Sequence, residues 1–244
     1  MLTSVRSLLA ASLLASAAVA TPAFAQDESE SDITVTGSVA LVTDYRFRGL
    51  SLSAGEPAIQ GSININHSSG FYVGTWASSM EDTPTYGEME LDIYGGWKGE
   101  VTPGLTVDAG LLYYAYPGKD DGAGPSDVFE PYLKLSTTLG PVGATLGVAY
   151  AWDQKSLGDE DNLYIFTDLS AGIPETPITL TAHLGYTDGF LTLTSDGDAF
   201  DYSVGASITV LGGLGLGVSY VGVEGPSIND LSDDAVVGTL SYSF

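Results

Sequence analysis

The sequence predicts an all-β protein, a transmembrane antiparallel up-and-down β-barrel of about 12 strands. Three observations support this prediction: apolar and polar residues alternate within twelve segments, short and long connections alternate between those segments, and the last segment ends on an aromatic residue, Phe244. Alternation with a period of two places successive side chains on opposite faces of a strand. A closed barrel has no free edge, so its outward face meets lipid while every backbone group stays paired.

The final segment, residues 234–244, shows this pattern clearly. One of its faces is apolar and aromatic, whereas the residues in between are mostly small and polar; the first face comprises Val236, Gly238, Leu240, Tyr242 and Phe244. A soluble protein seldom ends on an exposed aromatic edge strand, because open strand edges invite aggregation. A terminal aromatic residue on an alternating strand also resembles the signal that outer-membrane assembly machinery reads.

The first 25 residues are predicted to be a signal peptide. Arg6 supplies a positive charge, residues 8–20 form an apolar run, and Ala23-Phe24-Ala25 is a small-x-small cleavage site. The run is shorter than the roughly 20 residues that a membrane helix needs. Residues 26–32 are acidic and are predicted to be a flexible start of the mature protein. Residues 33–244 are assigned to the barrel.

The amino-acid composition excludes some classes of binding partner. The chain has 31 acidic residues against seven Lys and Arg, a formal net charge of −24. This balance argues against nucleic-acid binding, which needs a basic face. The chain has no cysteine, which excludes disulfides and a lipid-modified cysteine. We expect no cofactor, the lipid bilayer of a Gram-negative outer membrane as the surroundings, and small solutes or ions as the partners of a monomer.

The connections between the segments carry more weight than any single strand. Tight turns such as 140–141 alternate with long connections rich in Asp, Glu, Gly, Pro and Ser, such as 117–126. Short turns at one end and long loops at the other are typical of outer-membrane barrels, and would place both termini on the periplasmic side. A soluble β-sandwich, the alternative, need not have its long connections at one end. The twelve segments are 33–48, 57–67, 70–79, 88–99, 104–116, 127–139, 142–153, 161–172, 177–188, 199–210, 214–223 and 234–244.

Three sequence blocks in the first third of the chain resemble a known family. They are DYRFRG at residues 44–49, PAIQG at 57–61 and SGFYVGTWAS at 69–78. Over roughly residues 36–100 the chain is similar to the proteobacterial TorF family of porins, also called the Gcw-chp family. The resemblance implies an outer-membrane porin and brings no catalytic residues with it.

The alternation also predicts which charged side chains face the interior. Acidic residues outnumber basic ones there, which favours cations if the barrel conducts. Arg46 and Arg48 share one face of the first segment, where they either bind an anionic solute or neutralise acidic rows on neighbouring strands. A twelve-strand lumen lies between packed eight-strand barrels and open sixteen-strand porins, so we expect a narrow channel. The pore-lining candidates are Asp44, Arg46, Arg48, Glu90, Asp92, Asp108, Lys134, Asp168 and His183.

Two alternatives to a channel stay open. One is a non-conducting structural or surface-interaction barrel with acidic extracellular loops. The other is a barrel hydrolase, which needs a histidine with a Ser or carboxylate partner. His67 falls at a tight turn and is predicted to be a turn residue, whereas His183 faces the interior and could pair with Asp168 or Asp201. No nucleophile motif or metal-ligand cluster accompanies either histidine, so we do not expect an enzyme.

Overall fold

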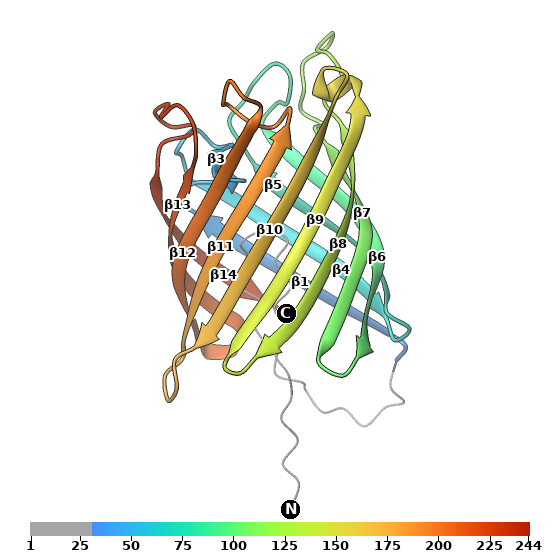
Figure 1. Cartoon of the computed structure of the whole chain (residues 1–244), viewed down its shortest axis with the longest axis vertical. Coiled ribbons are helices and arrows are strands. Elements are labelled where there is room, and N and C mark those ends of the chain that lie inside the picture. The colour runs from blue at the N-terminus through green and yellow to red at the C-terminus, as the bar shows by residue number, and fades with distance from the viewer. Residues whose placement is uncertain (1–30) are drawn as a thin grey trace, which may run out of the picture.

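The wall of the protein is a closed barrel of twelve antiparallel strands (Figure 1). The computed structural model describes residues 31–244, so the predicted signal peptide lies outside the described residues. The barrel closes where β14 pairs with β1, with Leu240 opposite Leu41. The wall strands are β1 (Ile33–Val42), β4 (Ala58–His67), β5 (Phe71–Ser79), β6 (Met89–Thr102), β7 (Leu105–Ala115), β8 (Val128–Leu139), β9 (Val142–Gln154), β10 (Glu160–Gly172), β11 (Ile178–Gly189), β12 (Asp198–Val210), β13 (Leu214–Val223) and β14 (Ala235–Ser243).

The two ends of the barrel differ, as the sequence predicts. Longer connections gather at the upper end in Figure 1, which we call the loop end. They are 43–57, 80–88, 116–127, 155–159, 190–197 and 224–234. The opposite end, the turn end, carries mostly tight turns, including Pro103-Gly104 and Gly140-Pro141. At this end His67, predicted to be a turn residue, is instead the last residue of β4, directly before the turn at Ser68-Ser69, and its Nδ1 lies 2.7 Å from the Ser69 hydroxyl. Within residues 31–244 no helix is long and apolar enough to cross a membrane.

Most predicted segments match the wall strands to within a few residues, but the first does not. The sequence predicts a strand over 33–48, whereas β1 ends at Val42 and the chain then turns into the barrel. The turn follows from local polar chemistry: Ser51 and Ser53 both donate hydrogen bonds to the carboxylate of Asp44. Such side chains offer partners that compete with a strand ladder. A smaller difference is at β6, which extends to Thr102 through an irregularity in its pairing with β7.

The distribution of side chains is the reverse of that in a soluble protein. Large apolar residues on the outer face are exposed, as for Ile63 (52 %) and Val204 (58 %). Charged residues on the inner face are buried, as for Glu90 (1 %) and Lys134 (2 %). In water such an outer face would be a large exposed apolar surface, whereas in a bilayer it meets lipid. This resolves the inside-or-outside ambiguity of the alternation in favour of the transmembrane barrel over the soluble sandwich.

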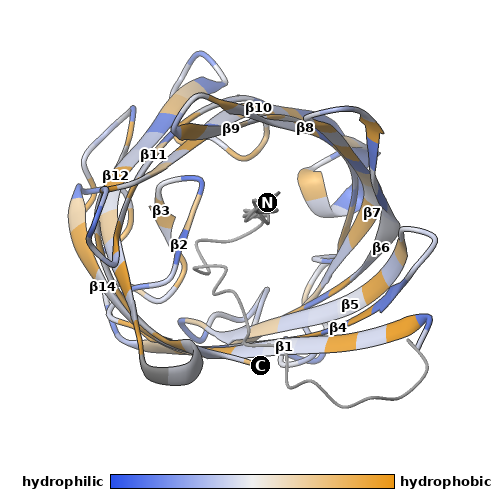
Figure 2. Cartoon of the chain, turned by 90° about the horizontal axis from the view of Figure 1, so that it is seen from below, coloured by the Kyte–Doolittle hydropathy of each residue, from blue (hydrophilic) through white to orange (hydrophobic). Residues whose placement is uncertain are grey.

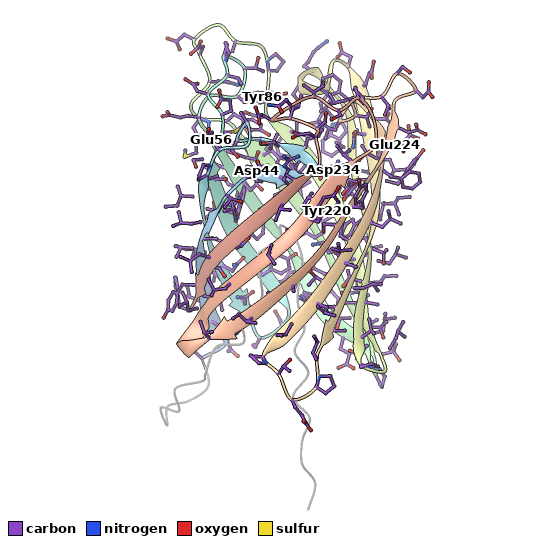
Figure 3. The ribbon with its side chains drawn as sticks, turned by 90° about the vertical axis from the view of Figure 1, so that its left-hand side faces the viewer. Asp44, Glu56, Tyr86, Tyr220, Glu224 and Asp234 are labelled. Carbon is purple, nitrogen blue, oxygen red and sulfur yellow. The ribbon has the colours of Figure 1, made fainter. Side chains whose placement is uncertain are left out.

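Aromatic side chains form a belt on the outside near each end of the wall. Near the loop end, the ring centroids of Tyr113 and Phe129 are 4.5 Å apart and those of Tyr186 and Phe200 are 5.0 Å apart. Figure 3 shows Tyr220 of this belt beneath the loops. Near the turn end, exposed rings include Phe71, Tyr242 and Phe244. Belts at two levels are typical of the two interfaces of a membrane-spanning barrel.

Several rings inside the barrel lie against glycines of the neighbouring strand. A Cβ atom on Gly147 of β9 would overlap the ring of Phe166 on β10, and one on Gly110 of β7 would overlap the ring of Tyr132 on β8. The missing side chain therefore lets each ring lie flat on the wall, as in the aromatic rescue of strand glycines.

Replacing Gly147 with alanine is expected to destabilise the barrel by about 1–3 kcal/mol, because the buried Phe166 ring must leave its position. The measurement is the midpoint of urea unfolding in lipid vesicles. Gly172→Ala is the matched control: Gly172 is also in a wall strand, but an added Cβ would meet nothing within 4 Å. Equal midpoints for the two variants would contradict the close-packing argument.

Candidate functional site

A short hairpin lies inside the barrel, between β1 and β4 in the chain. It consists of β2 (Arg46–Phe47) and β3 (Leu50–Ser51), which Figure 2 shows within the ring of wall strands. Its two-residue turn has positive φ at both Arg48 (48°) and Gly49 (83°), the pattern of a type I′ turn. A side chain at Gly49 would overlap Val223 of β13, so only glycine lets the tip approach the wall this closely.

Asp44 holds this inward segment together. Its carboxylate accepts hydrogen bonds from the hydroxyl of Ser51 (2.6 Å) and of Ser53 (3.1 Å), and it forms an ion pair with Arg46. The guanidinium of Arg46 also donates to the carbonyl of Gly49 (3.1 Å) and to that of Asp233 (2.7 Å) in the loop before β14. Figure 3 shows Asp44 in the loop half of the barrel, at about the height of Asp234.

Arg48 extends from the tip of the hairpin to the far wall. Its Nη2 lies 2.7 Å from Oε1 of Glu130 on β8, and the side-chain exposures of the two residues are 6 % and 4 %. The guanidinium also lies over the ring of Tyr164 on β10, 4.1 Å from the centroid. Burial acts to lower the pKa of Arg48, but the charge of Glu130, the two neighbouring tyrosines and the hydrogen bond to Glu130 together raise that pKa, so Arg48 stays charged. Arg48 thus bridges the lumen as one half of a buried ion pair.

Two aromatic residues pack the rest of the hairpin segment against the wall. Tyr45 contacts Trp76 of β5 at 5.4 Å between centroids, and Phe47 contacts Tyr114 of β7 edge-on at 5.9 Å. The phenol of Tyr45 donates to Glu90 of β6 (2.9 Å). Burial, and then the charges of Glu90 and Asp92, raise the pKa of Tyr45, so it stays a donor.

The buried carboxylates beside the hairpin differ in their partners. Glu90 accepts hydrogen bonds from Tyr45 (2.9 Å) and Tyr116 (3.4 Å), and Glu130 pairs with Arg48. Asp92 is 2 % exposed, and within residues 31–244 no donor reaches its buried Oδ1. An unpartnered buried carboxylate is costly unless water, a proton or a cation compensates it. Of the three carboxylates Glu90, Asp92 and Glu130, Asp92 is therefore the one least compensated by donors or positive charge.

His183 is the centre of a second polar group, on β10, β11 and β12. Its Nδ1 lies 2.6 Å from Asp168 and its Nε2 lies 2.9 Å from Asp201, so both pairings that the sequence suggested are present. The hydroxyl of Tyr164 is 2.8 Å from the same Nε2. Because Tyr164 also lies under Arg48, this group adjoins the tip of the hairpin.

A third group of polar residues lies nearer the turn end. Asp108 of β7 stands opposite Lys134 of β8 in the sheet and accepts a hydrogen bond from Tyr72 (2.5 Å). The Lys134 ammonium lies 5.2 Å from the centroid of the Tyr132 ring. Below this level the inward residues are mostly small and polar, among them Thr106, Ser136, Thr145, Ser170 and Ser207.

All nine candidate residues lie in the interior, but not all in the predicted way. The expectation that Arg46 and Arg48 share a face of the first wall strand is wrong, because both belong to the hairpin. The structure joins each of them to a carboxylate, Asp44 and Glu130. The tyrosines Tyr45, Tyr114 and Tyr164 were not among the candidates. Tyr114 and Tyr164 could have been found from the sequence, because the alternation places both on the inward face of their segments. No sequence signal identifies Tyr45, because the alternation places it on the outward face of the first segment.

A closed barrel with an apolar outer face and a charged interior defines this protein as a transmembrane β-barrel. The chain belongs to the Gcw_chp family, described as a bacterial protein of unknown function, which it matches over residues 26–244. No curated protein matches the chain.

Two solved structures of porins have a similar fold. The NanC porin, at 11 % identity, aligns with 86 % of this chain and 99 % of its own, with a TM-score of 0.58. The KdgM porin, solved in complex with disordered oligogalacturonate, is 9 % identical, with the same coverages and a TM-score of 0.59. At these identities the likeness extends to the fold alone.

Proposed function

We propose that the protein is a monomeric channel in the outer membrane of a Gram-negative bacterium, which lets small solutes or ions diffuse passively. The observation that carries this proposal is a closed wall with charged residues inside and apolar residues outside. Such an interior is suited to water and ions. The shared fold with porins and the resemblance of residues 36–100 to TorF porins support it. The turn end, where β1 begins and β14 ends, would then face the periplasm.

The channel is narrow in this proposal, and its constriction lies at the hairpin. Residues 43–57 occupy the loop half of the interior, and most of the buried apolar residues gather around them, including Tyr114, Tyr164 and Trp76. The passage would therefore be widest toward the turn end, where small polar residues line the wall.

We further propose a preference for cations. The two arginines that would attract anions are both compensated, Arg46 by Asp44 and Arg48 by Glu130. Within the part of the chain that the structure describes, Glu90 accepts hydrogen bonds from the phenols of Tyr45 and Tyr116, and no donor reaches Oδ1 of Asp92. The uncompensated charge beside the hairpin is therefore negative, which favours entry of cations.

Asp92→Asn is expected to lower the K⁺/Cl⁻ permeability ratio about tenfold, because one charge at roughly 6 Å in water changes the local concentrations of cations and of anions about threefold each, in opposite directions. The reversal potential of single channels in a KCl gradient measures it. Asn is close to isosteric, and Oδ1 of Asp92 accepts no hydrogen bond from any described residue, so the fold should tolerate the change. Asp82→Asn, in an exposed loop, removes the same charge and is the matched control.

The possible results separate the parts of the proposal. An anion-selective wild type would refute the cation preference and leave the channel in place. A folded barrel that never conducts would refute the channel and favour a surface-interaction role for the acidic loops. The hydrolase alternative finds little support: both ring nitrogens of His183 face carboxylates, and within the described chain neither is hydrogen-bonded to a serine hydroxyl.

A further inference from the structure

We propose that residues 43–57, which we call the inner segment, are a gate, and that the channel opens when this segment undocks from the wall. The inference rests on the proposed channel function and adds its regulation. In the structure the segment is docked: its tip reaches Glu130 on β8, and Gly49 lies against Val223 on β13. Contacts on both sides of the lumen make this the closed state.

The inner segment is built to move as a unit. Its own hydrogen bonds hold it together: Leu52 N to Tyr45 O (2.8 Å), Tyr45 N to Ser53 Oγ (2.9 Å) and the bonds to Asp44. None of these involves the wall. The segment would therefore keep its shape on undocking, and the ladder of the wall would stay intact because all twelve strands pair without it.

The docking contacts include polar groups that water can replace. Two backbone bonds tie the segment to neighbouring loops, from Ser51 N to Leu231 O (2.7 Å) and from Glu81 N to Leu52 O (2.8 Å). Among the described residues, Nη1 of Arg48 and Oδ1 of Asp233 at the same interface are buried without a hydrogen-bond partner, and Oδ1 of Asp233 lies 4.0 Å from Nη2 of Arg46. Hydration of these atoms on undocking offsets part of the lost contacts, because buried polar atoms without partners are costly. Undocking therefore costs less than the number of docking contacts alone would indicate.

The segment also has a place to pivot. Ala54 and Gly55 both have positive φ, 51° and 73°, in the arm that leads to β4. Gly55 is exposed, and its conformational freedom lets the arm change direction at little cost. The other arm begins at Thr43, which stays fixed to β14 by a hydrogen bond to the carbonyl of Gly238 (3.0 Å). Motion about Ala54-Gly55 would move the tip away from Glu130.

A disulfide lock tests the gate. A Cβ atom on Gly55 would lie 3.7 Å from the Cβ of Asp230, within the range of about 3.5–4.5 Å that disulfides need. Both residues are exposed, and the chain has no cysteine of its own. The double variant Gly55→Cys/Asp230→Cys is recorded in a planar bilayer, oxidised and then reduced. We expect the open probability to be at least tenfold lower when oxidised. Each single variant is a control, and loss of maleimide labelling verifies the disulfide.

A second variant weakens docking without adding a crosslink. Tyr45→Phe removes the hydrogen bond to Glu90 and keeps the ring against Trp76. The lost hydrogen bond, to a charged group, exists only in the docked state. Its removal therefore destabilises the docked state relative to the undocked state, and the open probability should rise about tenfold or more. Tyr86→Phe is the matched control, a loop tyrosine that packs on Tyr116.

The two proposals fail in different ways. If the oxidised double variant conducts like the reduced one, and Tyr45→Phe conducts like the wild type, then the inner segment is no gate although the channel is real. If the disulfide does not form, the result with Tyr45→Phe decides alone. If the wild type, the reduced double variant and Tyr45→Phe all fold and none conducts, the channel itself is refuted.

Discussion

Replacing Arg48 with glutamine is expected to lower the free energy of unfolding by about 3–5 kcal/mol, the cost of breaking a buried ion pair by removing one partner. The variant leaves Glu130, whose side chain is 4 % exposed, without its cation. It also removes the guanidinium from the face of the Tyr164 ring. The measurement is urea unfolding of the protein folded into lipid vesicles.

The loss should be largely recovered in a double variant. Glu130→Gln alone leaves Arg48 buried and uncompensated, whereas Arg48→Gln/Glu130→Gln removes both charges together. We therefore expect the double variant to be more stable than either single variant, because an apolar or neutral replacement of a buried pair costs much less than a half-broken pair. A double-mutant cycle gives the coupling energy directly.

Lys155→Gln is the control for the loss of a positive charge. Lys155 pairs with Asp159 at 2.8 Å, but its side chain is 77 % exposed, so its removal should leave the unfolding midpoint unchanged. If Arg48→Gln were as stable as Lys155→Gln, the Arg48–Glu130 pair would be hydrated and weak, and the docked hairpin would depend on its aromatic contacts instead.

The wall could be predicted from the sequence because the deciding information is local. The alternation in residues 178–189, for example, shows in the printed sequence which side chains share a face, and the turn residues show where each strand ends. Closure of the sheet into a barrel is expected from the number of strands, and because nothing in the sequence would protect the two edges of an open sheet. The charged faces of β6, β8 and β11 were assigned to the interior by the same period.

The hairpin could not be predicted in this way, since residues 44–48 continue the alternation of β1. Tyr45 and Phe47 alternate with Asp44, Arg46 and Arg48, which reads as five more residues of strand. Local hydrogen bonds to Asp44 begin the turn, but contacts between distant residues, such as Arg46 with Asp233 and Arg48 with Glu130, hold the hairpin inside the barrel. Periodicity shows which face a side chain occupies but carries no information about its partner across the lumen.

The same limit applies to His183. Its inward position and two potential carboxylate partners were evident from the alternation, yet the simultaneous contact with Asp168 and Asp201 depends on the register of three strands. Asp168 stands directly opposite His183 in the β10–β11 pair, whereas Asp201 reaches it diagonally from β12. Register is set by the turns and by the packing of all neighbouring strands, so the sequence of β11 alone does not determine it.

Leu184→Arg is expected to destabilise the folded barrel by about 2–4 kcal/mol, the cost of a basic side chain on the lipid face near the bilayer midplane. Leu184 lies in the middle of β11 and is 49 % exposed on the outer face. In a soluble protein, arginine at such an exposed position would be close to neutral. The sign of the effect therefore tests the membrane assignment of the whole wall.

Leu193→Arg is the matched control, since Leu193 has a similar exposure of 38 % but lies in the loop between β11 and β12. Unfolding in vesicles should show a lower midpoint for Leu184→Arg and an unchanged midpoint for Leu193→Arg. If the outer face of β11 met water instead of lipid, the two variants would not differ in their midpoints, because water would solvate both arginines equally well. Equal midpoints would mean that the outer face of β11 is covered by water or protein, and the membrane-spanning assignment would have to be abandoned for that part of the wall.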